Sequence, residues 1–297
     1  MAITAPRPLV PTRVETRSRR TPGGHRRRSS LGLVVRIVLA AVTAIVMAFP
    51  LWVMLTTAFS GQQTFDANVS VIPTRFSLDN FTRVFDAWPV GTWFGNSVVI
   101  TAITTILTVV VSVLAGYAFA KLVFPAKNVL FLLLLATMMI PTQAILVPQF
   151  RIVNGLGLVG TFWAVILPGA AATFGIFLAR QFMLAIPNEI IEAGKIDGAG
   201  SLRIFWSIVL PLCKPLLAVL TLLTVMYQWN DFLWPLIALK DPTLYTLPIG
   251  LQFLQGQYQA DYGALMAMTL IAVVPLVVLF LAFQRFFVQG LATTGIR

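Results

Sequence analysis

Residues 192–211 read EAGKIDGAGSLRIFWSIVLP, a polar, glycine-rich stretch that lies between long apolar runs on both sides. Just before it, Pro187, Asn188 and Glu189 favour the start of a helix, with Asn188 as the N-cap and Glu189 in the first turn. A polar segment of this kind in an otherwise apolar chain indicates a loop that another surface contacts.

The composition is that of a polytopic membrane protein. Of the 297 residues, 58% are hydrophobic and only 10% are charged, which excludes an ordinary soluble globular chain. The single cysteine, Cys213, excludes an internal disulfide, and the single histidine, His25, argues against a Cys/His metal site. We therefore expect no metal to be bound by this chain.

Much of the net charge of +11 lies at the N-terminus, where eight arginines precede the first apolar run: Arg7, Arg13, Arg17, Arg19, Arg20, Arg26, Arg27 and Arg28. This segment cannot bury enough apolar surface to offset the entropy of ordering it. We predict that residues 1–32 form a basic, disordered cytoplasmic tail that contacts membrane lipid and binds no nucleic acid. A cleaved signal peptide is the alternative, but residues 37–59 are 23 uncharged residues, longer than a signal peptide's apolar region of about 7–15.

A helix needs about 20 apolar residues to cross the hydrocarbon core of a bilayer. Six runs meet this length without the alternation of barrel strands, so we predict an all-α fold with six transmembrane helices. They are residues 37–59, 98–119, 129–150, 161–179, 215–238 and 263–283. Several contain a proline, which removes a backbone donor and permits a kink: Pro50, Pro141, Pro148, Pro168, Pro235 and Pro275.

The distribution of Lys and Arg sets the predicted orientation. With the N-terminus inside, the cytoplasmic side carries 17 of the 21 basic residues, and the outside only Arg75, Arg83, Arg151 and Lys240. We therefore predict two cytoplasmic termini, a membrane domain at residues 33–290 with an inner loop at about 180–212, and a short C-terminal tail at 291–297. The outer loop at 60–97 contains Trp88 and Trp93, which form either an aromatic belt at the membrane surface or a docking surface.

The inner loop has the pattern of a short helix. Glu192, Lys195, Ile196 and Ala199 recur at spacings of three and four residues, so they are predicted to share one helix face. Three glycines within seven residues argue for a binding partner or for a helix break, because glycine is costly inside a helix. The small residues that would let another surface approach closely are Ala193, Gly194, Gly198, Ala199 and Gly200.

The Gly194–Lys195 pair does not belong to a phosphate-binding loop. A Walker A loop would need glycine where Glu189 stands and Ser or Thr where Ile196 stands. The chain is therefore predicted to bind no nucleotide by this route.

The same loop resembles the EAA loop of bacterial ABC importer permeases. The resemblance rests on Glu192–Ala193, on Gly198 and, after nine further residues, on Ile208, Leu210 and Pro211, with Gly194 where alanine is usual. The stretches IDGA at 196–199, WNDFLWP at 229–235 and MIP at 139–141 resemble the carbohydrate-uptake branch, of the maltose-permease G-subunit type. The resemblance covers about residues 35–290.

This resemblance implies the type I ABC importer permease fold, in a multi-pass protein of the bacterial cytoplasmic membrane. The implied partners are a homologous second permease, two ATPase subunits and an extracytoplasmic substrate-binding protein. The chain itself would have no catalytic residue and bind no cofactor, since ATP and Mg are used by the ATPase subunits. The residues implied to couple this chain to the ATPase are Glu192, Ala193, Gly194, Lys195, Asp197, Gly198, Ala199 and Pro211.

The implied cargo is a sugar, an oligosaccharide or a sugar-like solute; glycerol-phosphate or glycerophosphodiester importers share the same architecture. The candidates for the substrate path are Trp229, Asn230 and Asp231, near the outer end of the fifth span, and Gln143 in the third span. Asp231 either lines the path, with Trp229 as a stacking face, or caps a helix at the outer interface. A stand-alone secondary transporter or channel is less well supported, because only Asp231 approaches a charge within a span. An intramembrane enzyme would need acid, base or metal ligands that the spans do not contain.

Overall fold

The computed structural model describes residues 30–61, 76–255 and 261–294. The predicted tail at 1–32 therefore lies almost wholly outside the described residues. At the other end, helix α14 (Tyr262–Thr294) continues to Thr294, into the segment that the sequence suggested as a tail from residue 291. Within the described ranges the chain is helical, and its β contact is an isolated bridge between Ser60 and Phe76.

The chain forms two compact units, Met1–Phe49 and Pro50–Arg297. Helix α1 (Ser30–Ala58) supplies the described part of the first unit and opens the second at Pro50. All of the other helices belong to the second unit, and the arrangement below is that of this unit.

The predicted all-α membrane fold is confirmed. Four helical segments are long and apolar enough to cross a membrane: Gly32–Ala58, Val90–Lys121, Trp163–Leu184 and Tyr262–Gln284. The third of these consists of α6 (Trp163–Ala170) and α7 (Thr173–Leu184), which are separated by a short break. Two bent helix pairs raise the number of crossings in the described chain to six if each pair is one span.

Both bent pairs depart from the straight spans that the sequence suggested. Helix α4 (Lys127–Thr137) meets α5 (Thr142–Gly155) at 104°, so the predicted span 129–150 is broken just before α5, at Pro141. A proline there removes a backbone donor and holds its own backbone out of helical geometry.

The second bent pair lies on either side of Cys213. The chain passes through α9 (Ser201–Ile204), the π-helix η1 (Phe205–Val209) and α10 (Leu210–Leu212), and then turns by 77° into α11 (Lys214–Trp229). The predicted fifth span, 215–238, was wrong as a single helix, because α11 ends at Trp229 and α12 (Leu233–Ala238) begins after a break.

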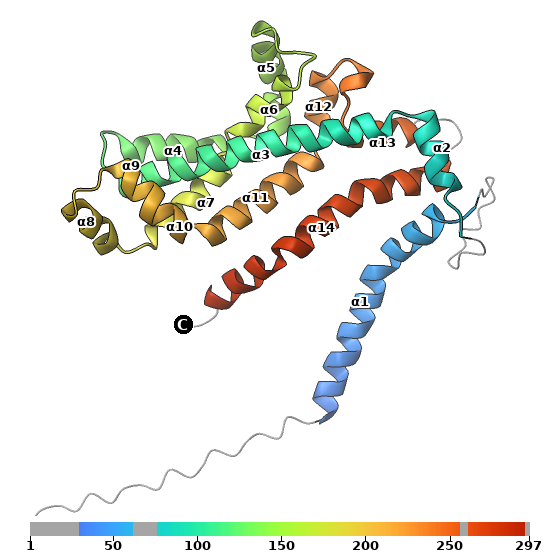
Figure 1. Ribbon diagram of the computed structural model, residues 1–297, viewed down its shortest axis with the longest axis horizontal. Helices are drawn as coiled ribbons and strands as arrows, with labels where there is room; N and C mark the ends of the chain where they lie inside the picture. Colours follow the sequence, from blue (N-terminus) through green and yellow to red (C-terminus); the bar gives the residue numbers. More distant parts are fainter. Residues whose placement is uncertain (1–29, 62–75, 256–260, 295–297) are drawn as a thin grey trace, which may run out of the picture. The chain divides into compact units, whose positions relative to one another are not determined.

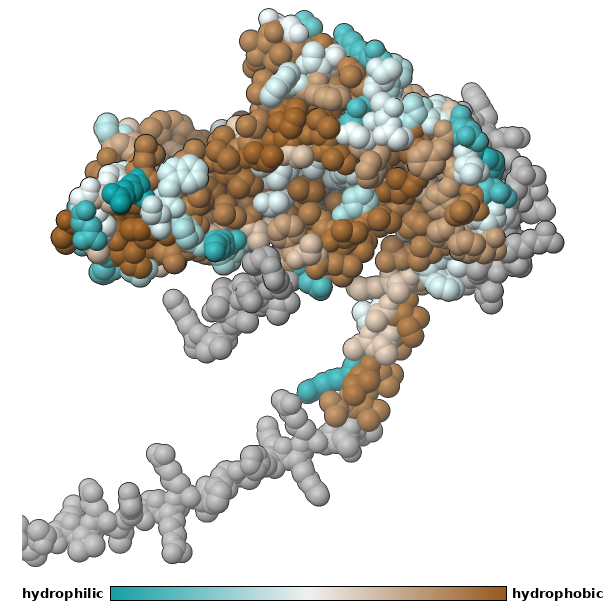
Figure 2. Space-filling view, in the orientation of Figure 1, coloured by the Kyte–Doolittle hydropathy of each residue, from teal (hydrophilic) through white to brown (hydrophobic). Residues whose placement is uncertain are grey.

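Helix α3 (Val90–Lys121) is the axis of the second unit and packs against α7, α11 and α6 along its length (Figure 1). Helix α8 (Asn188–Ile196) lies near its C-terminal end, whereas α2 (Asp79–Ala87) and α13 (Leu247–Gln255) lie near its N-terminal end. Figure 2 shows apolar surface over the long helices and polar side chains at these two ends and over the projecting region of α5 and α12.

The interface between α3 and α7 is built from small residues. A Cβ added to Gly116 would lie 2.5 Å from Cβ of Ala179, and one added to Gly175 would lie 2.3 Å from Oγ of Ser112. Close approach of two backbones through such residues is the usual way in which membrane helices associate. Hydrophobic clusters lie on either side, at the α8 end around Phe205 and at the α2 end around Trp93.

Neither reading of Trp93 as a surface residue was correct. Its side chain is only 2% exposed, and its Nε1 donates a hydrogen bond to the carbonyl of Pro242, 3.0 Å away, at the start of the short 3-10 helix η2 (Pro242–Leu244). Trp88 packs partly buried against the same cluster.

Candidate functional site

Helix α8 begins where the sequence predicted, but its N-cap is different. Pro187 occupies the N-cap position and no side chain caps the helix, so the prediction that Asn188 is the cap was wrong. Instead, Oδ1 of Asn188 accepts a hydrogen bond from Nζ of Lys121, at 2.8 Å, and the same ammonium group donates to the carbonyl of Ile186 at 2.6 Å. Lys121 is the last residue of α3, so it ties the start of α8 to the end of the central helix.

The end of α8 is a Schellman motif. The N–H of Gly198 donates to the carbonyl of Lys195, and the N–H of Ala199 donates to the carbonyl of Gly194, both at 3.0 Å. Gly198 has φ +78°, the left-handed conformation that this motif requires at the residue after the cap. The glycines therefore mark a helix break, one of the two outcomes that the sequence suggested, and Ala199 lies beyond the helix.

The inner side of α8 packs against its own chain. Ile191 and Gly194 are buried, and a Cβ added to Gly194 would lie 3.1 Å from Cδ1 of Ile208 and 3.2 Å from Cγ1 of Ile204. The small residue at 194 thus allows α8 to approach the segment from α9 to η1. Of the residues proposed to couple to the ATPase, Gly194 faces the permease itself.

The opposite side of α8 is exposed and mixes charge with apolar surface. Glu192, Lys195 and Asp197 are exposed, and Ile196 is 87% exposed at the last position of the helix. Beyond the break, Leu202 is 70% and Trp206 is 59% exposed. We call this set of residues the α8 surface; large apolar side chains rimmed by charges are typical of a protein interaction site.

A rigid support lies beneath the α8 surface. The hydroxyl of Tyr117, on α3, donates to the carbonyl of Ser201 at 3.2 Å, and its ring contacts that of Phe205 with centroids 5.1 Å apart. Phe205 and Val209 of the π-helix are buried in the same cluster. Pro211, exposed on α10, follows directly. Sequence reasoning missed Tyr117 and Lys121, because nothing in an apolar run shows which turn will meet a distant loop.

The candidate residues of the substrate path lie at helix breaks. Trp229 ends α11, but its ring is buried and its Nε1 donates to the carbonyl of Ala272 on α14, 3.0 Å away. Asn230 is exposed and bonds back to Met226, Asp231 lies half-buried in the break before α12, and Gln143 is exposed in the first turn of α5. The structure brings Trp229, Asn230 and Asp231 together through the chain itself, with Gln143 on a separate bent pair.

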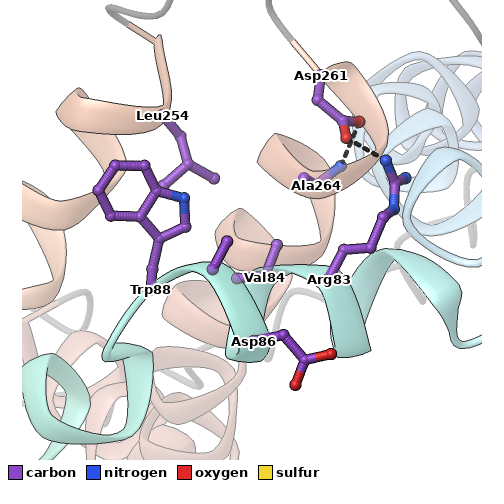
Figure 3. A pocket seen from close by; sticks show the side chains of 8 residues that line it. Arg83, Val84, Asp86, Trp88, Leu254, Asp261 and Ala264 are labelled. Atoms are coloured by element: carbon purple, nitrogen blue, oxygen red, sulfur yellow. Dashed lines mark hydrogen bonds and ion pairs between the residues drawn. The ribbon is translucent and has the colours of Figure 1, made fainter.

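A pocket lies at the α2 end of the unit, opposite the α8 surface, with a volume of about 460 Å³. Figure 3 shows Arg83 and Asp261 facing each other on one side of it and Trp88 beside Leu254 on the other. Among the residues that the structure describes, no group of three or more His, Cys, Asp or Glu side chains could hold a metal ion.

Beside this pocket a chain of hydrogen bonds connects three helices. The amide of Asn80 donates to the carbonyls of Thr57, Ala58 and Ser60 at the end of α1, at 3.1, 3.0 and 2.7 Å. Its oxygen accepts from Arg83, which pairs with Asp261. We call this set of side chains, Asn80, Arg83 and Asp261, the α2 clamp. No pattern in the sequence predicted it, because its members are scattered polar residues on a short helix and a loop.

Comparison with known proteins is consistent across sequence and structure. The family model described as "Binding-protein-dependent transport system inner membrane component" matches residues 109–293. The arabinooligosaccharides transport system permease protein AraQ of Halalkalibacterium halodurans is 39% identical over 261 residues, which are 86% of this chain and 94% of that protein. The sn-glycerol-3-phosphate transport system permease protein UgpE of Yersinia pestis is 33% identical over 273 residues, with coverages of 89% and 97%.

The fold recurs in a solved structure. A chain from the crystal structure of a bacterial ABC transporter involved in the import of the acidic polysaccharide alginate superposes with a TM-score of 0.78 at 22% identity. The match covers 90% of this chain and all of that one. Taken with the family match over residues 109–293, these likenesses establish that the chain belongs to the binding-protein-dependent transport system inner membrane components, the permease subunits of ABC importers.

Proposed function

We propose that this permease moves a sugar or oligosaccharide across the cytoplasmic membrane by alternating access. It would work with a homologous second permease, two ATPase subunits and an extracytoplasmic binding protein, and would itself catalyse no reaction. The proposal is supported by the 39% identity to an arabinooligosaccharide permease over 86% of the chain. A glycerol-phosphate solute is the second candidate, because a relative named for that solute is 33% identical over 89% of the chain.

The α8 surface is proposed as the contact with the ATPase. The observation that carries this step is Ile196, a large apolar side chain that is 87% exposed among charged neighbours at a polar end of the unit. Ordinary lipid-facing exposure does not account for it, because Lys195 and Asp197 beside it in the chain and Glu192 one turn earlier are charged and exposed. An apolar residue with a charged rim fits a groove in another protein.

The packing beneath α8 would turn this contact into movement of the spans. The inner side of α8 is buried against Ile204 and Ile208, and its start is fastened to Lys121 of α3. A displacement of α8 by the ATPase therefore passes to the end of the central helix. ATP binding and hydrolysis would take place in the partner subunits, with α8 and both termini on the cytoplasmic side, as the distribution of Lys and Arg indicates.

The solute is tested through the cognate binding protein. We expect its melting temperature to rise with arabinooligosaccharides or other oligosaccharides and to stay unchanged with sn-glycerol 3-phosphate and glycerophosphodiesters, because only a bound ligand stabilises the native state. Stabilisation by the phosphate compounds alone would replace the sugar assignment with the second candidate.

The coupling role is tested by co-purification with the ATPase subunits. Glu192→Lys should abolish the association, and Ile196→Ala should weaken it about tenfold, which corresponds to about 1.4 kcal/mol. Neither change should prevent membrane insertion, since both side chains are exposed. Asn128→Lys, at an exposed position on α4, is the matched control and should leave the association intact. Wild-type association of both α8 variants would refute the coupling role.

A further inference from the structure

Helix α3 carries buried hydroxyl groups, in the middle of its long apolar run, that lack hydrogen-bond partners. Thr104, Thr105 and Ser112 are buried, and no described residue accepts from or donates to their side-chain oxygens. Serine and threonine in a helix usually bond to the carbonyl one turn earlier, as Thr269 does to Leu265 at 2.7 Å in α14. An unpaired polar group in a membrane interior costs free energy, so three on one helix require an explanation.

Two of these hydroxyls, on Thr104 and Ser112, lie opposite the break between α6 and α7, whereas Thr105 lies on another face of α3. The backbone leaves helical geometry at Ala171 and Ala172, so the last carbonyls of α6 have no following helical turn to donate to them. A side chain of α3 supplies one donor: Oγ1 of Thr108 bonds to the carbonyl of Gly169 at 3.1 Å. The neighbouring helix α3 therefore supplies part of the hydrogen bonding that the carbonyls at the break need.

The unpartnered hydroxyls lie on both sides of this bond. Thr104, Thr108 and Ser112 are four residues apart, so they form one line along α3 with a rise of about 6 Å between neighbours. Thr104 contacts Gly169, where a Cβ would lie 2.9 Å from its Cγ2, and Ser112 contacts Gly175 in the first turn of α7. The line thus covers the break from the end of α6 to the start of α7.

We propose that the break between α6 and α7 is a hinge of the transport cycle and that the hydroxyl line on α3 supplies its hydrogen bonds in two states. In the conformation described here, Thr108 holds the carbonyl of Gly169. In the other conformation, the carbonyls of the break have moved along α3, and the hydroxyls of Thr104 and Ser112 donate hydrogen bonds to them. Alternating access requires two conformations of similar free energy. The requirement is met if each conformation pairs some of these donors and leaves the others unpaired, because the number of hydrogen bonds then changes little between the two.

Packing alone does not account for the hydroxyls. Alanine at 112 or valine at 104 would fill the same space without a buried polar atom, and Gly169 and Gly175 already provide the close approach. A hinge at this break rests on the proposed alternating access but does not depend on which solute is carried, so it can be tested without a solute.

The test compares two states of the assembled transporter in detergent: nucleotide-free, and trapped with ATP and vanadate. Thr108→Val should lower the melting temperature by about 2 °C in only one of the two states, the one that has the conformation described here. This is the amount expected for one hydrogen bond between membrane helices. Thr104→Val and Ser112→Ala should lower it by a similar amount in the other state only. In the state that Thr108 stabilises, these two variants should melt at the wild-type temperature or above it.

Thr269→Val is the matched control, because its hydroxyl bonds within its own helix; its shift should be the same in both states. The proposal is overturned if Thr104→Val and Ser112→Ala destabilise the same state as Thr108→Val, or destabilise neither. It is also overturned if these variants prevent assembly while the control does not, since the hydroxyls would then be needed in every state.

Discussion

At the scale of single residues, Gly198 shows how one position serves both the fold and the contact. Its φ of +78° closes the Schellman motif that ends α8, and a Cβ built on it meets no atom within 4 Å. A substitution there therefore costs backbone strain and no steric clash. The chemistry of the new side chain then decides what happens at the exposed surface.

We predict that Gly198→Asn retains ATPase association, whereas Gly198→Asp loses it. Asn and Asp have almost the same shape and both tolerate the left-handed conformation, so the cost to the fold should be similar, about 1 kcal/mol. The two variants differ in a negative charge placed beside Asp197, on the surface proposed to enter the ATPase. Co-purification with the ATPase and the melting temperature of the permease measure the two effects separately. Equal association of the two variants would place Gly198 outside the contact.

Gly194 is a residue whose role the sequence could not assign. The family pattern placed it among the coupling residues, and the structure buries it against Ile204 and Ile208. A motif records which residues recur but not which side of a helix they occupy. Glu192 and Ile196, on the same helix, point the other way and are exposed.

At the scale of elements, the interface of α3 and α7 depends on backbones that approach closely. Gly116 touches Ala179, where an added Cβ would lie 2.5 Å from Cβ and 3.0 Å from the backbone of α7. Backbone atoms cannot move aside as a flexible side chain would. The helix pair that holds the proposed hinge is therefore held in register by Gly116 and its neighbours.

We predict that Gly116→Ala destabilises the permease by about 2 kcal/mol through overpacking, although alanine is the better helix former. Gly95→Ala is the matched control on the same helix, because no atom lies within 4 Å of its Cβ. It should leave the melting temperature unchanged or raise it. A melting temperature of Gly116→Ala equal to that of Gly95→Ala would mean that the two helices separate easily at this point.

Much of the fold could be predicted from hydropathy, since each span requires a long apolar run. The bends could not be placed in the same way. Pro141 marks a bend of 104°, whereas Pro275 lies within the continuous helix α14, so a proline alone does not decide between them. The end of α11 at Trp229 was missed because the apolar run continues to residue 238, while the helix stops where Trp229 packs against α14.

At the scale of the whole second unit, the two polar ends differ in how they are held. The α8 end combines an exposed surface with a support fastened by Lys121 and Tyr117. The α2 end is held by the α2 clamp, in which Asn80 satisfies carbonyls at the end of α1 and Arg83 reaches Asp261 beside the start of α14. Gly263 packs so closely on Asn80 that a Cβ would lie 2.5 Å from its Oδ1.

Asn80 is therefore predicted to matter more for stability than the ion pair does. The side chains of Arg83 and Asp261 are 36% and 39% exposed, so solvent screens their attraction, whereas Asn80 is buried. Asn80→Asp keeps the shape but removes the amide donors and turns a negative charge toward the carbonyls of Thr57, Ala58 and Ser60. We expect a loss of about 2–3 kcal/mol.

Asp261→Asn, which removes the charge of the pair but keeps an oxygen that can accept from Arg83 and from the N–H of Ala264, should cost about 1 kcal/mol or less. Asp79→Asn, exposed on the same short helix, is the control for a change of charge and should leave stability unchanged. Thermal melting of the purified permease ranks these variants, and co-purification should show the ATPase still bound in all of them, because the α8 surface lies at the opposite end of the unit. If Asn80→Asp melted with the control, the carbonyls at the end of α1 would have other donors, and the clamp would reduce to a weak surface ion pair.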